Sequence, residues 1–256
     1  MQNQFVLSPF FLEKPLPTAE RLTLPDWIIN KPLLQEKGQT KRMSILHRQL
    51  ANIVANTVKN GCRPVSIAGD CCTVIGVLAG FQRANVNPRL VWFDAHGDFN
   101  TWETTPSGFI GGMPLAMILG RGEQTLLQAV SLTPLPERDV ILANARDLDP
   151  GERELLQQSR VRHVPEVASI PQLVSTERPI HIHLDTDVIN ASEAPAMRYP
   201  VKGGPTLNTL REVVRRLAKT GRVVGVSMTL WDFEQDADRR TEHASMVLLK
   251  AALGDD

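Results

Sequence analysis

The sequence has few cysteines, no excess of charge of either sign and no long apolar run. Its three cysteines among 256 residues are too few for a disulfide framework, so we expect a reducing, cytoplasmic setting. Basic and acidic side chains number 28 each, which gives no overall charge to attract nucleic acid or a membrane surface. No apolar run approaches the roughly 20 residues that span a bilayer, and residues 1–5 lack the basic start of a signal peptide. Neither nucleic acid nor a membrane is therefore an expected partner, and the oligomeric state stays open.

The sequence also lacks internal repeats and low-complexity linkers, so residues 1–256 are expected to form a single domain. Strand-like and helix-like patterns alternate along it. Strands are expected at residues 4–11, 63–68, 89–94, 139–145, 161–164, 180–185 and 222–228, and helices at 40–60, 73–82, 113–119, 123–130, 153–158, 207–219 and 241–253. This alternation predicts an α/β fold of three layers, α/β/α, with a mostly parallel central sheet. Ligands of such sheets bind beyond the carboxyl ends of the strands.

The most informative motif is a buried strand that ends in acidic side chains. Residues 90–93 (Leu-Val-Trp-Phe) form a continuous apolar run, as in a parallel sheet buried on both faces. Asp94, His96 and Asp98 follow two residues apart, so in extended backbone they point to the same side. Burying such groups together is costly unless a cation lies among them, and carboxylate and imidazole are usual ligands of divalent metals. The alternative is an Asp-capped turn with an unrelated histidine.

A second strand repeats this pattern. Residues 179–184 (Pro-Ile-His-Ile-His-Leu) lead into Asp185 and Asp187, which are again two residues apart. Two acidic strand ends in one α/β chain indicate one acidic site at a shared edge of the sheet. Four carboxylates and one histidine can hold a pair of divalent ions, with shared oxygens bridging them. The repetition therefore favours a metal site over the capped turn.

Six stretches of the chain resemble motifs of the ureohydrolases, the family of arginases and agmatinases, and they occur in the family's order. They are residues 68–72 (Ala-Gly-Asp-Cys-Cys), 92–100 (Trp-Phe-Asp-Ala-His-Gly-Asp-Phe-Asn), 107–114 (Ser-Gly-Phe-Ile-Gly-Gly-Met-Pro), 146–152 (Arg-Asp-Leu-Asp-Pro-Gly-Glu), 179–187 (Pro-Ile-His-Ile-His-Leu-Asp-Thr-Asp) and 203–204 (Gly-Gly). The resemblance implies an arginase-like fold and a metal-dependent hydrolase that acts on linear amidines.

The resemblance further implies a binuclear manganese centre, with two Mn²⁺ ions per chain. Asp94 and Asp185 would bridge the ions, Cys71 and Asp98 would complete one ion, and the remaining two ligands would complete the other. A metal-bridging hydroxide would attack the guanidinium carbon of an arginine-like substrate and release a urea and an amine. Asp98 would also act catalytically by orienting that nucleophile. The six implied ligands are Cys71, Asp94, His96, Asp98, Asp185 and Asp187.

Five further positions match the arginase signature for the amino-acid end of the substrate. Asn100, Thr105 and Ser107 match the positions that bind the carboxylate, and short polar donors on a loop suit that role. Asp149 and Glu152 match the positions on the ammonium side. Their alternative role is capping of the helix that follows them. A guanidino amino acid is therefore a more suitable substrate than a bare amine such as agmatine.

The chain departs from the family pattern in three places. Cys71 stands where the family has a histidine ligand. The softer thiolate of a cysteine binds zinc or iron in preference to manganese. Gly111 stands where arginases have a histidine thought to shuttle protons, and Phe109 replaces a polar neighbour. Leu230 aligns with a glutamate that pairs with the guanidinium. What replaces the missing proton shuttle is not evident from the sequence.

Two histidines precede the acidic end of the second strand. His181 and His183 share a strand face with Asp185 but lie deeper in the strand than the implied ligands. His181 matches a family histidine, whereas His183 stands where a serine is usual. We expect both to be buried hydrogen-bonding residues rather than ligands.

Two kinds of function fit these observations. The first is a hydrolase that cleaves a C–N bond of a guanidino amino acid. Cys71 together with Gly111 also resembles the Nω-hydroxy-L-arginine hydrolase of D-cycloserine biosynthesis, a family member that yields hydroxyurea and ornithine. The second is a metal- and amino-acid-binding protein with weakened or lost turnover, which Gly111, Phe109 and Leu230 favour. The complete set of ligands and the amino-acid clamp favour the hydrolase.

Overall fold

A parallel sheet with helices on both faces forms the centre of the fold. The computed structural model describes residues 1–174, 177–229 and 231–255. In these residues the main sheet has eight strands in the order β4-β1-β5-β10-β9-β6-β7-β8, and each neighbouring pair is parallel. Its strands are β1 Asn3–Ser8, β4 Ile28–Ile29, β5 Arg63–Ala68, β6 Arg89–Phe93, β7 Val140–Ala143, β8 Arg162–Val164, β9 Ile180–Leu184 and β10 Val223–Thr229.

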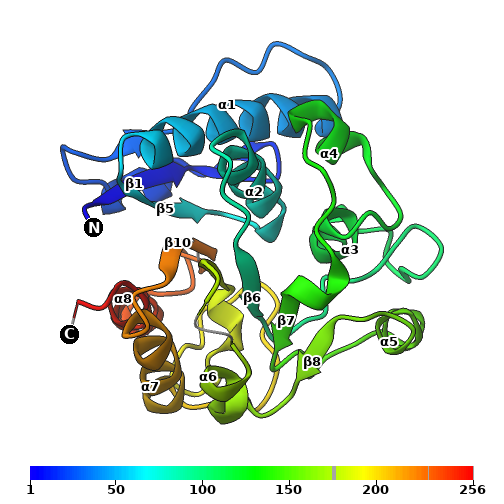
Figure 1. Ribbon diagram of the computed structural model, residues 1–256, viewed down its shortest axis with the longest axis vertical. Helices are drawn as coiled ribbons and strands as arrows, with labels where there is room; N and C mark the ends of the chain where they lie inside the picture. The colour runs from blue at the N-terminus through cyan, green and yellow to red at the C-terminus, as the bar shows by residue number, and fades with distance from the viewer. Residues whose placement is uncertain (175–176, 230, 256) are drawn as a thin grey trace.

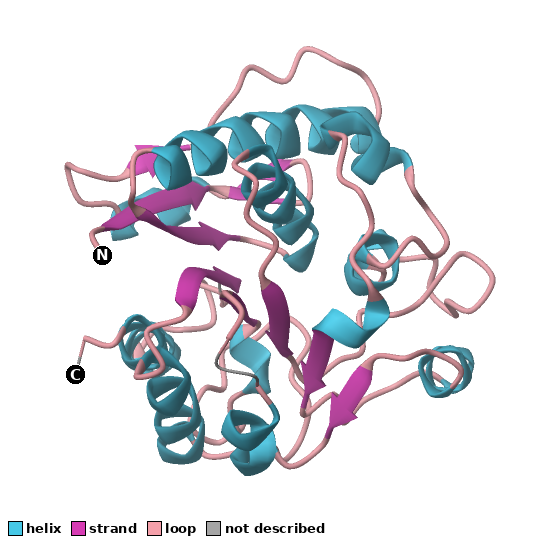
Figure 2. Cartoon of the chain, in the orientation of Figure 1, coloured by secondary structure: helices cyan, strands magenta, loops and turns pink. Residues whose placement is uncertain are grey.

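The helices form two layers, one on each side of the sheet (Figures 1 and 2). They are α1 Gln39–Lys59, α2 Val74–Arg83, α3 Pro114–Ile118, α4 Thr125–Val130, α5 Pro150–Gln157, α6 Ile170–Leu173, α7 Leu207–Ala218 and α8 Arg240–Leu253. One layer contains α1 to α4, and the other contains α6 to α8. The α/β/α prediction is confirmed.

Strand β6 shows why both faces of the sheet need a helical layer. Val91 and Phe93 pack into the apolar core beneath α7 and α8, whereas Leu90 and Trp92 pack into the core beneath α2 and α3. All four side chains are fully buried. A continuous apolar run in a strand therefore indicates burial on both faces, as the sequence predicts.

Helices α1 and α2 pack closely because α2 carries glycine where the two helices meet. A Cβ atom on Gly80 would lie 2.5 Å from the Cβ of Val54, and one on Gly76 would lie 2.8 Å from the carbonyl oxygen of His47. Either distance is too short for a side chain, so these glycines set the spacing of the helices. This packing fixes the start of α2, and with it the turn that carries Cys71.

The acidic strand ends are neighbours in the sheet. Strands β6 and β9 pair in parallel, with Phe93 opposite Leu184, so Asp94 and Asp185 leave the sheet at the same level. Strand β5, which leads to Cys71, lies one strand beyond β9, across β10. The carboxyl ends of these strands therefore form one rim, as expected for a ligand site in a parallel sheet.

Several short elements differ from the expectation. The strand expected at residues 4–11 ends at Ser8, and β2 Phe10–Phe11 then pairs antiparallel with β3 Lys14–Pro15. Helix α5 starts at Pro150 rather than at residue 153, because proline fits the first turn of a helix. Among the described residues, none of the helices is long and apolar enough to cross a membrane.

Candidate metal centre and substrate pocket

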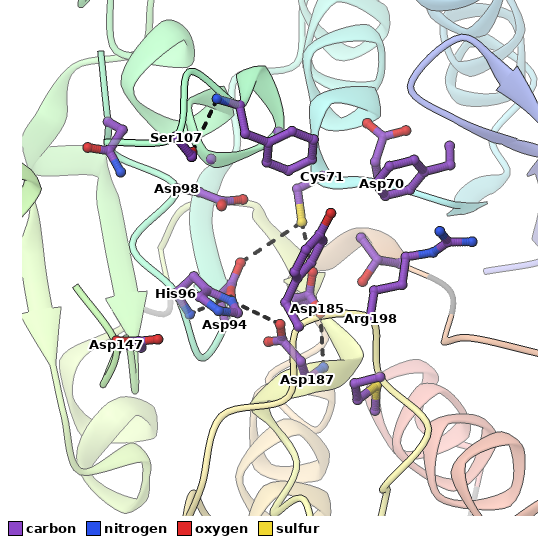
Figure 3. A pocket seen from close by; sticks show the side chains of 18 of the residues that line it. Asp70, Cys71, Asp94, His96, Asp98, Ser107, Asp147, Asp185, Asp187 and Arg198 are labelled. Carbon is purple, nitrogen blue, oxygen red and sulfur yellow. Dashed lines mark hydrogen bonds and ion pairs between the residues drawn. The ribbon is translucent and has the colours of Figure 1, made fainter. Parts of the chain in front are cut away.

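A cavity of about 560 Å³ lies beyond the carboxyl ends of β5, β6 and β9. Figure 3 shows Cys71, Asp94, Asp185 and Asp187 converging on it from the segments that follow β5, β6 and β9. The structure thus brings together residues that are far apart in the sequence. The cavity is lined by every residue that the sequence assigns to metal or substrate binding: Cys71, Asp94, His96, Asp98, Asn100, Thr105, Ser107, Asp149, Glu152, Asp185 and Asp187.

Two groups of potential ligands share the carboxylate of Asp94. In the first group, the Cys71 Sγ lies 3.0 Å from Asp185 Oδ2 and 3.9 Å from Asp94 Oδ2. In the second, the His96 Nδ1 lies 2.9 Å from Asp187 Oδ2 and 3.6 Å from Asp94 Oδ1. Within each group the ligand atoms all lie within 4.8 Å of one another. This arrangement suits two neighbouring cations with Asp94 between them.

Backbone amides hold these carboxylates in place. Asp94 accepts hydrogen bonds from the backbone N–H of His96 at 2.7 Å and from the indole N–H of Trp92 at 3.0 Å. Asp187 accepts one from the backbone N–H of Ala95 at 3.1 Å. Asp185 accepts one from the backbone N–H of Asp187 at 2.9 Å. The acidic loops after β6 and β9 are therefore hydrogen-bonded to each other and within themselves, which orients their carboxylates before any ligand binds.

Asp98 lies beside the two groups rather than within them. Its backbone has a φ of 49°, a left-handed conformation that is uncommon for a residue with a side chain. Its carboxylate is buried, and among the described residues its Oδ2 has no hydrogen-bond partner. Buried polar atoms are normally paired, so this free oxygen indicates a partner that a cation or its water can supply.

The four carboxyl groups of the centre have raised pKa values. Burial, and then the charge of Asp187, raise the pKa of Asp185 to about 7. Burial and the neighbouring Asp94 raise the pKa of Asp98 well above its ordinary value. The same combination of burial and carboxylate repulsion raises the pKa of Asp94 and of Asp187. Their ionised forms therefore need positive charge nearby.

The other two potential ligands respond to the same acidic surroundings. Burial disfavours the charged form of His96, but hydrogen bonds to Asp187 and Asp94 outweigh it and raise the pKa to about 12. Burial, and then the charge of Asp185, raise the pKa of the Cys71 thiol well above its ordinary value. Divalent cations reverse both effects, because they favour neutral imidazole and thiolate as ligands. The donor set and its electrostatics therefore fit a pair of divalent ions.

The positions expected to bind the amino-acid end line the same cavity. Asn100 Nδ2 donates to Asp149 Oδ2 at 2.9 Å, and the hydroxyls of Thr105 and Ser107 lie 3.3 Å apart. Glu152 accepts backbone N–H groups from Phe99 at 2.8 Å and from Asp149 at 3.2 Å. The capping interpretation is thus confirmed for Glu152, which still lines the cavity.

Phe109 explains why residue 111 is glycine. A Cβ atom on Gly111 would lie 2.3 Å from the Cε1 atom of the Phe109 ring and 2.4 Å from its Cζ atom. The ring therefore fills the space that a histidine at position 111 would need. The histidine expected to shuttle protons in arginases is therefore absent, and the apolar ring of Phe109 occupies its space. Leu230, the third departure, lies outside the described residues.

The contribution of Phe11, Arg198 and Tyr199 to the cavity wall was not anticipated from the sequence. Phe11 stacks on Phe109, with ring centroids 6.2 Å apart, and Tyr199 lies 5.7 Å from the same ring. The guanidinium carbon of Arg198 lies 4.6 Å from the centre of the Phe11 ring. Arg198 and Tyr199 belong to a long loop without periodicity, so no local pattern indicates their position.

His181 and His183 are buried hydrogen-bonding residues, as predicted. Both rings lie 2.9 Å from the hydroxyl of Ser227 on β10, and the second ring also reaches Cys71. Burial lowers the pKa of His181 to about 3 and that of His183 well below its ordinary value. Both rings are therefore neutral near pH 7.

The chain has relatives among proteins of known activity. It is 29% identical over 246 residues to the arginase of Bacillus subtilis, a match that covers 90% of this chain and 83% of the relative. It is 26% identical over 251 residues to the N(omega)-hydroxy-L-arginine amidinohydrolase of Streptomyces lavendulae, covering 97% of this chain and 85% of the relative.

The same family appears in comparisons of fold and of family patterns. The crystal structure of arginase from Bacillus cereus superimposes with a TM-score of 0.87, at 23% identity, over 100% of this chain and 99% of the other. That likeness concerns the fold. The pattern of the arginase family matches residues 23–254, which is most of the sequence. The chain therefore belongs to the arginase family, whose members are metal-dependent hydrolases of the ureohydrolase type.

Proposed function

We propose that this protein hydrolyses a C–N bond of a guanidino amino acid at a centre of two manganese ions, and that it prefers a weakly basic guanidino group. The observation that carries the proposal is the cavity itself, which is lined both by two adjoining groups of potential metal ligands and by the five residues expected to bind an amino acid. The three free cysteines are compatible with the reducing, cytoplasmic setting proposed for this reaction.

Each side of the cavity has a separate role in this proposal. Cys71 and Asp98 would hold one ion and His96 and Asp187 the other, together with Asp94 and Asp185. Bound ions lower the pKa of water and so supply a nucleophile near neutral pH. Asp98 would orient that nucleophile through its Oδ2, which has no hydrogen-bond partner among the described residues.

The clamp sets the distance between the substrate's α-carbon and the metal centre. Asn100, Thr105 and Ser107 offer hydrogen-bond donors to a carboxylate. Asp149 and the firmly held Glu152 lie beside them and favour an ammonium group. Together they align an amino acid so that its far end reaches the carboxylates of the centre.

The substrate preference follows from Phe109 and Gly111. Cleavage of arginine requires attack on a resonance-stabilised cation and departure of a strongly basic amine, which needs a proton. General acid help with such a step is worth roughly 10²–10⁴-fold, and an aromatic ring beside a glycine cannot provide it. A hydroxyl on the guanidino group lowers its basicity and makes the group closer to neutral. Nω-hydroxy-L-arginine, cleaved to hydroxyurea and ornithine, is therefore the proposed substrate.

The test compares kcat/KM for Nω-hydroxy-L-arginine and L-arginine in the manganese-loaded protein. We expect the hydroxylated substrate to be cleaved at least 10-fold more efficiently, with ornithine and hydroxyurea appearing in equal amounts. Asp98→Asn is the matched control, because it keeps the size of the side chain and removes its charge. Preference for L-arginine would refute the substrate argument. Absence of turnover with any guanidino or ureido amino acid would favour a binding protein.

A further inference from the structure

A buried histidine lies directly against the sulfur of Cys71. The His183 Nε2 is 3.2 Å from the Cys71 Sγ, and both side chains are almost fully buried. The indole of Trp92 packs on the imidazole, with ring centroids 4.1 Å apart, and restricts its rotation. The two unusual residues at positions 71 and 183 are therefore in contact and form one unit.

The other side of this ring is held by a short chain of hydrogen bonds. Strands β9 and β10 pair so that Ser227 lies opposite His183. The hydroxyl of Ser227 is 2.9 Å from the Nδ1 of His183 and 2.9 Å from the Nε2 of His181. The result is a continuous path from His181 through Ser227 and His183 to the sulfur of Cys71.

Counting protons leaves two possible directions for this series of hydrogen bonds. A serine hydroxyl has one proton, so Ser227 can donate to only one of the two rings and must accept from the other. In the direction that we infer, the His181 Nε2–H donates to Ser227, and Ser227 donates to the Nδ1 of His183. The proton of the neutral His183 ring is then on Nε2, and it points at the sulfur. A sulfur that accepts this N–H needs no proton of its own.

An N–H donor beside Cys71 offsets the effect of the neighbouring carboxylates on its sulfur. On its open side the sulfur faces the carboxylates of Asp94 and Asp185, which disfavour a thiolate. A neutral N–H on the buried side stabilises the thiolate without adding a charge that would compete with a cation. It also fixes the direction in which the sulfur points, because a cysteine side chain has only one rotatable bond before its sulfur.

We propose that His183 is the positioning residue for Cys71, holding its sulfur as a thiolate ligand through an N–H···S hydrogen bond that Ser227 and His181 orient. Partners of this kind, one step removed from the metal, typically change metal affinity by roughly 10–100-fold. The inference rests on the proposed metal centre, in which Cys71 is a ligand.

The experiment reads the sulfur–metal contact directly in the cobalt(II)-loaded protein. A thiolate bound to cobalt(II) gives a sulfur-to-metal charge-transfer absorption in the near ultraviolet, which we expect in the parent chain and not in Cys71→Ser. His183→Leu is expected to shift or weaken this absorption and to lower the cobalt affinity roughly 10–100-fold. His183→Gln keeps an N–H that can reach the sulfur, and should restore part of both.

Two further variants make the outcome decisive. Ser227→Ala keeps both imidazole rings and removes only the hydroxyl, so it tests the series of hydrogen bonds even when His183→Leu fails to fold. It should shift the absorption in the same direction as His183→Leu. His47→Leu is the matched control, since His47 is an equally buried imidazole on α1, away from the cavity. Its absorption and affinity should equal those of the parent.

The results separate the inference from the function on which it rests. A parent chain that binds cobalt without the charge-transfer absorption shows that Cys71 is not a ligand, which overturns the metal assignment together with the inference. A parent chain with the absorption, and unchanged absorption and affinity in both His183→Leu and Ser227→Ala, overturns the inference alone. A shifted or weakened absorption in these variants, with partial recovery in His183→Gln, supports it.

Discussion

Phe109 and Gly111 behave as one unit at the scale of single residues, because the ring of the first occupies the space above the second. The distance of 2.3 Å between the Phe109 ring and a Cβ placed on Gly111 rules out any larger residue there while the ring keeps its position. The ring is itself held between Phe11 and Tyr199. Restoring a histidine at position 111 therefore requires removal of the ring.

We predict that Gly111→His has little or no effect on arginine cleavage alone but raises it when combined with Phe109→Ala. In the single variant the imidazole is displaced, whereas in the double variant it has room to deliver a proton to the departing amine. General acid catalysis typically contributes roughly 10²–10⁴-fold to a rate, and the gain in kcat should not exceed that contribution. The measurement is kcat for L-arginine in the parent, both single variants and the double variant.

Phe109→Ala alone is the control for this prediction, since it enlarges the cavity without adding a proton donor. Equal gains in Phe109→Ala and in the double variant would show that space, not proton transfer, limits the reaction. The sequence shows that residue 111 is glycine. It does not show why, because the contact depends on how the chain brings an aromatic ring back over its own turn.

At the scale of elements, residues at the start of α5 belong to the proposed substrate clamp and also stabilise the fold. Glu152 accepts backbone N–H groups from Phe99 and Asp149, which ties the loop after β6 to this helix. Burial is the main reason that its pKa is raised to about 7, and the charge of Asp149 also contributes. Capping favours the charged form of this carboxyl group, because backbone N–H groups donate to it, whereas burial favours the neutral form.

The raised pKa of Glu152 gives a prediction for the metal-free protein. The pKa of Glu152 in the folded chain, about 7, exceeds the ordinary value of 4.5 for a glutamate side chain. The stabilising contribution is therefore complete below about pH 4.5 and is lost as the pH rises through about 7. At roughly 1.36 kcal/mol for each pKa unit, the change is up to about 3 kcal/mol.

Glu152→Gln should flatten this part of the pH dependence, whatever it does to stability at any one pH. The check is urea unfolding of the chelator-treated parent and variant between pH 4.5 and pH 8. Asp238→Asn, at a fully exposed carboxylate, is the control and should leave the slope unchanged. An unchanged slope in Glu152→Gln would show that other carboxylates set it.

The elements themselves were largely predictable from the sequence, whereas their junctions were less so. Apolar runs such as residues 90–93 identify buried strands because every side chain in them is covered. Short elements such as β2 and β4 escape such analysis because two residues carry no periodicity. The proline at position 150 moved the start of α5, which the helical pattern alone does not show.

At the scale of the whole molecule, strand order makes the site. Sequence motifs predicted which residues end the strands, but not that β9 pairs with β6 and that β5 lies beyond β10. The order is set by packing of the whole sheet between its two helical layers. For the same reason, the loop that brings Arg198 and Tyr199 to the cavity was not predictable. Arg146 holds that loop, donating to the backbone carbonyls of Asp187 and Val201 at 3.1 Å each.

The crowding of carboxylates at one rim links metal binding to pH in the whole protein. In the metal-free chain, burial and mutual repulsion raise the pKa values of Asp94, Asp98, Asp185 and Asp187, and Asp185 reaches about 7. Raised values mean that stability is lost as the pH rises and these groups ionise. Bound cations compensate the same charges, so they must displace protons at low pH and stabilise most at high pH.

We therefore predict that manganese raises the melting temperature more at pH 8 than at pH 6. At 100 times its Kd, each ion should add about 2.7 kcal/mol, or roughly 5–10 °C in a chain of this size. Asp185→Asn should reduce both the shift and its pH dependence, because it removes the group that titrates near pH 7. Elemental analysis of the loaded parent should give close to two ions per chain. A value near zero, or equal shifts at both pH values, would contradict the metal centre, since ligand carboxylates with these pKa values cannot bind a cation without releasing protons.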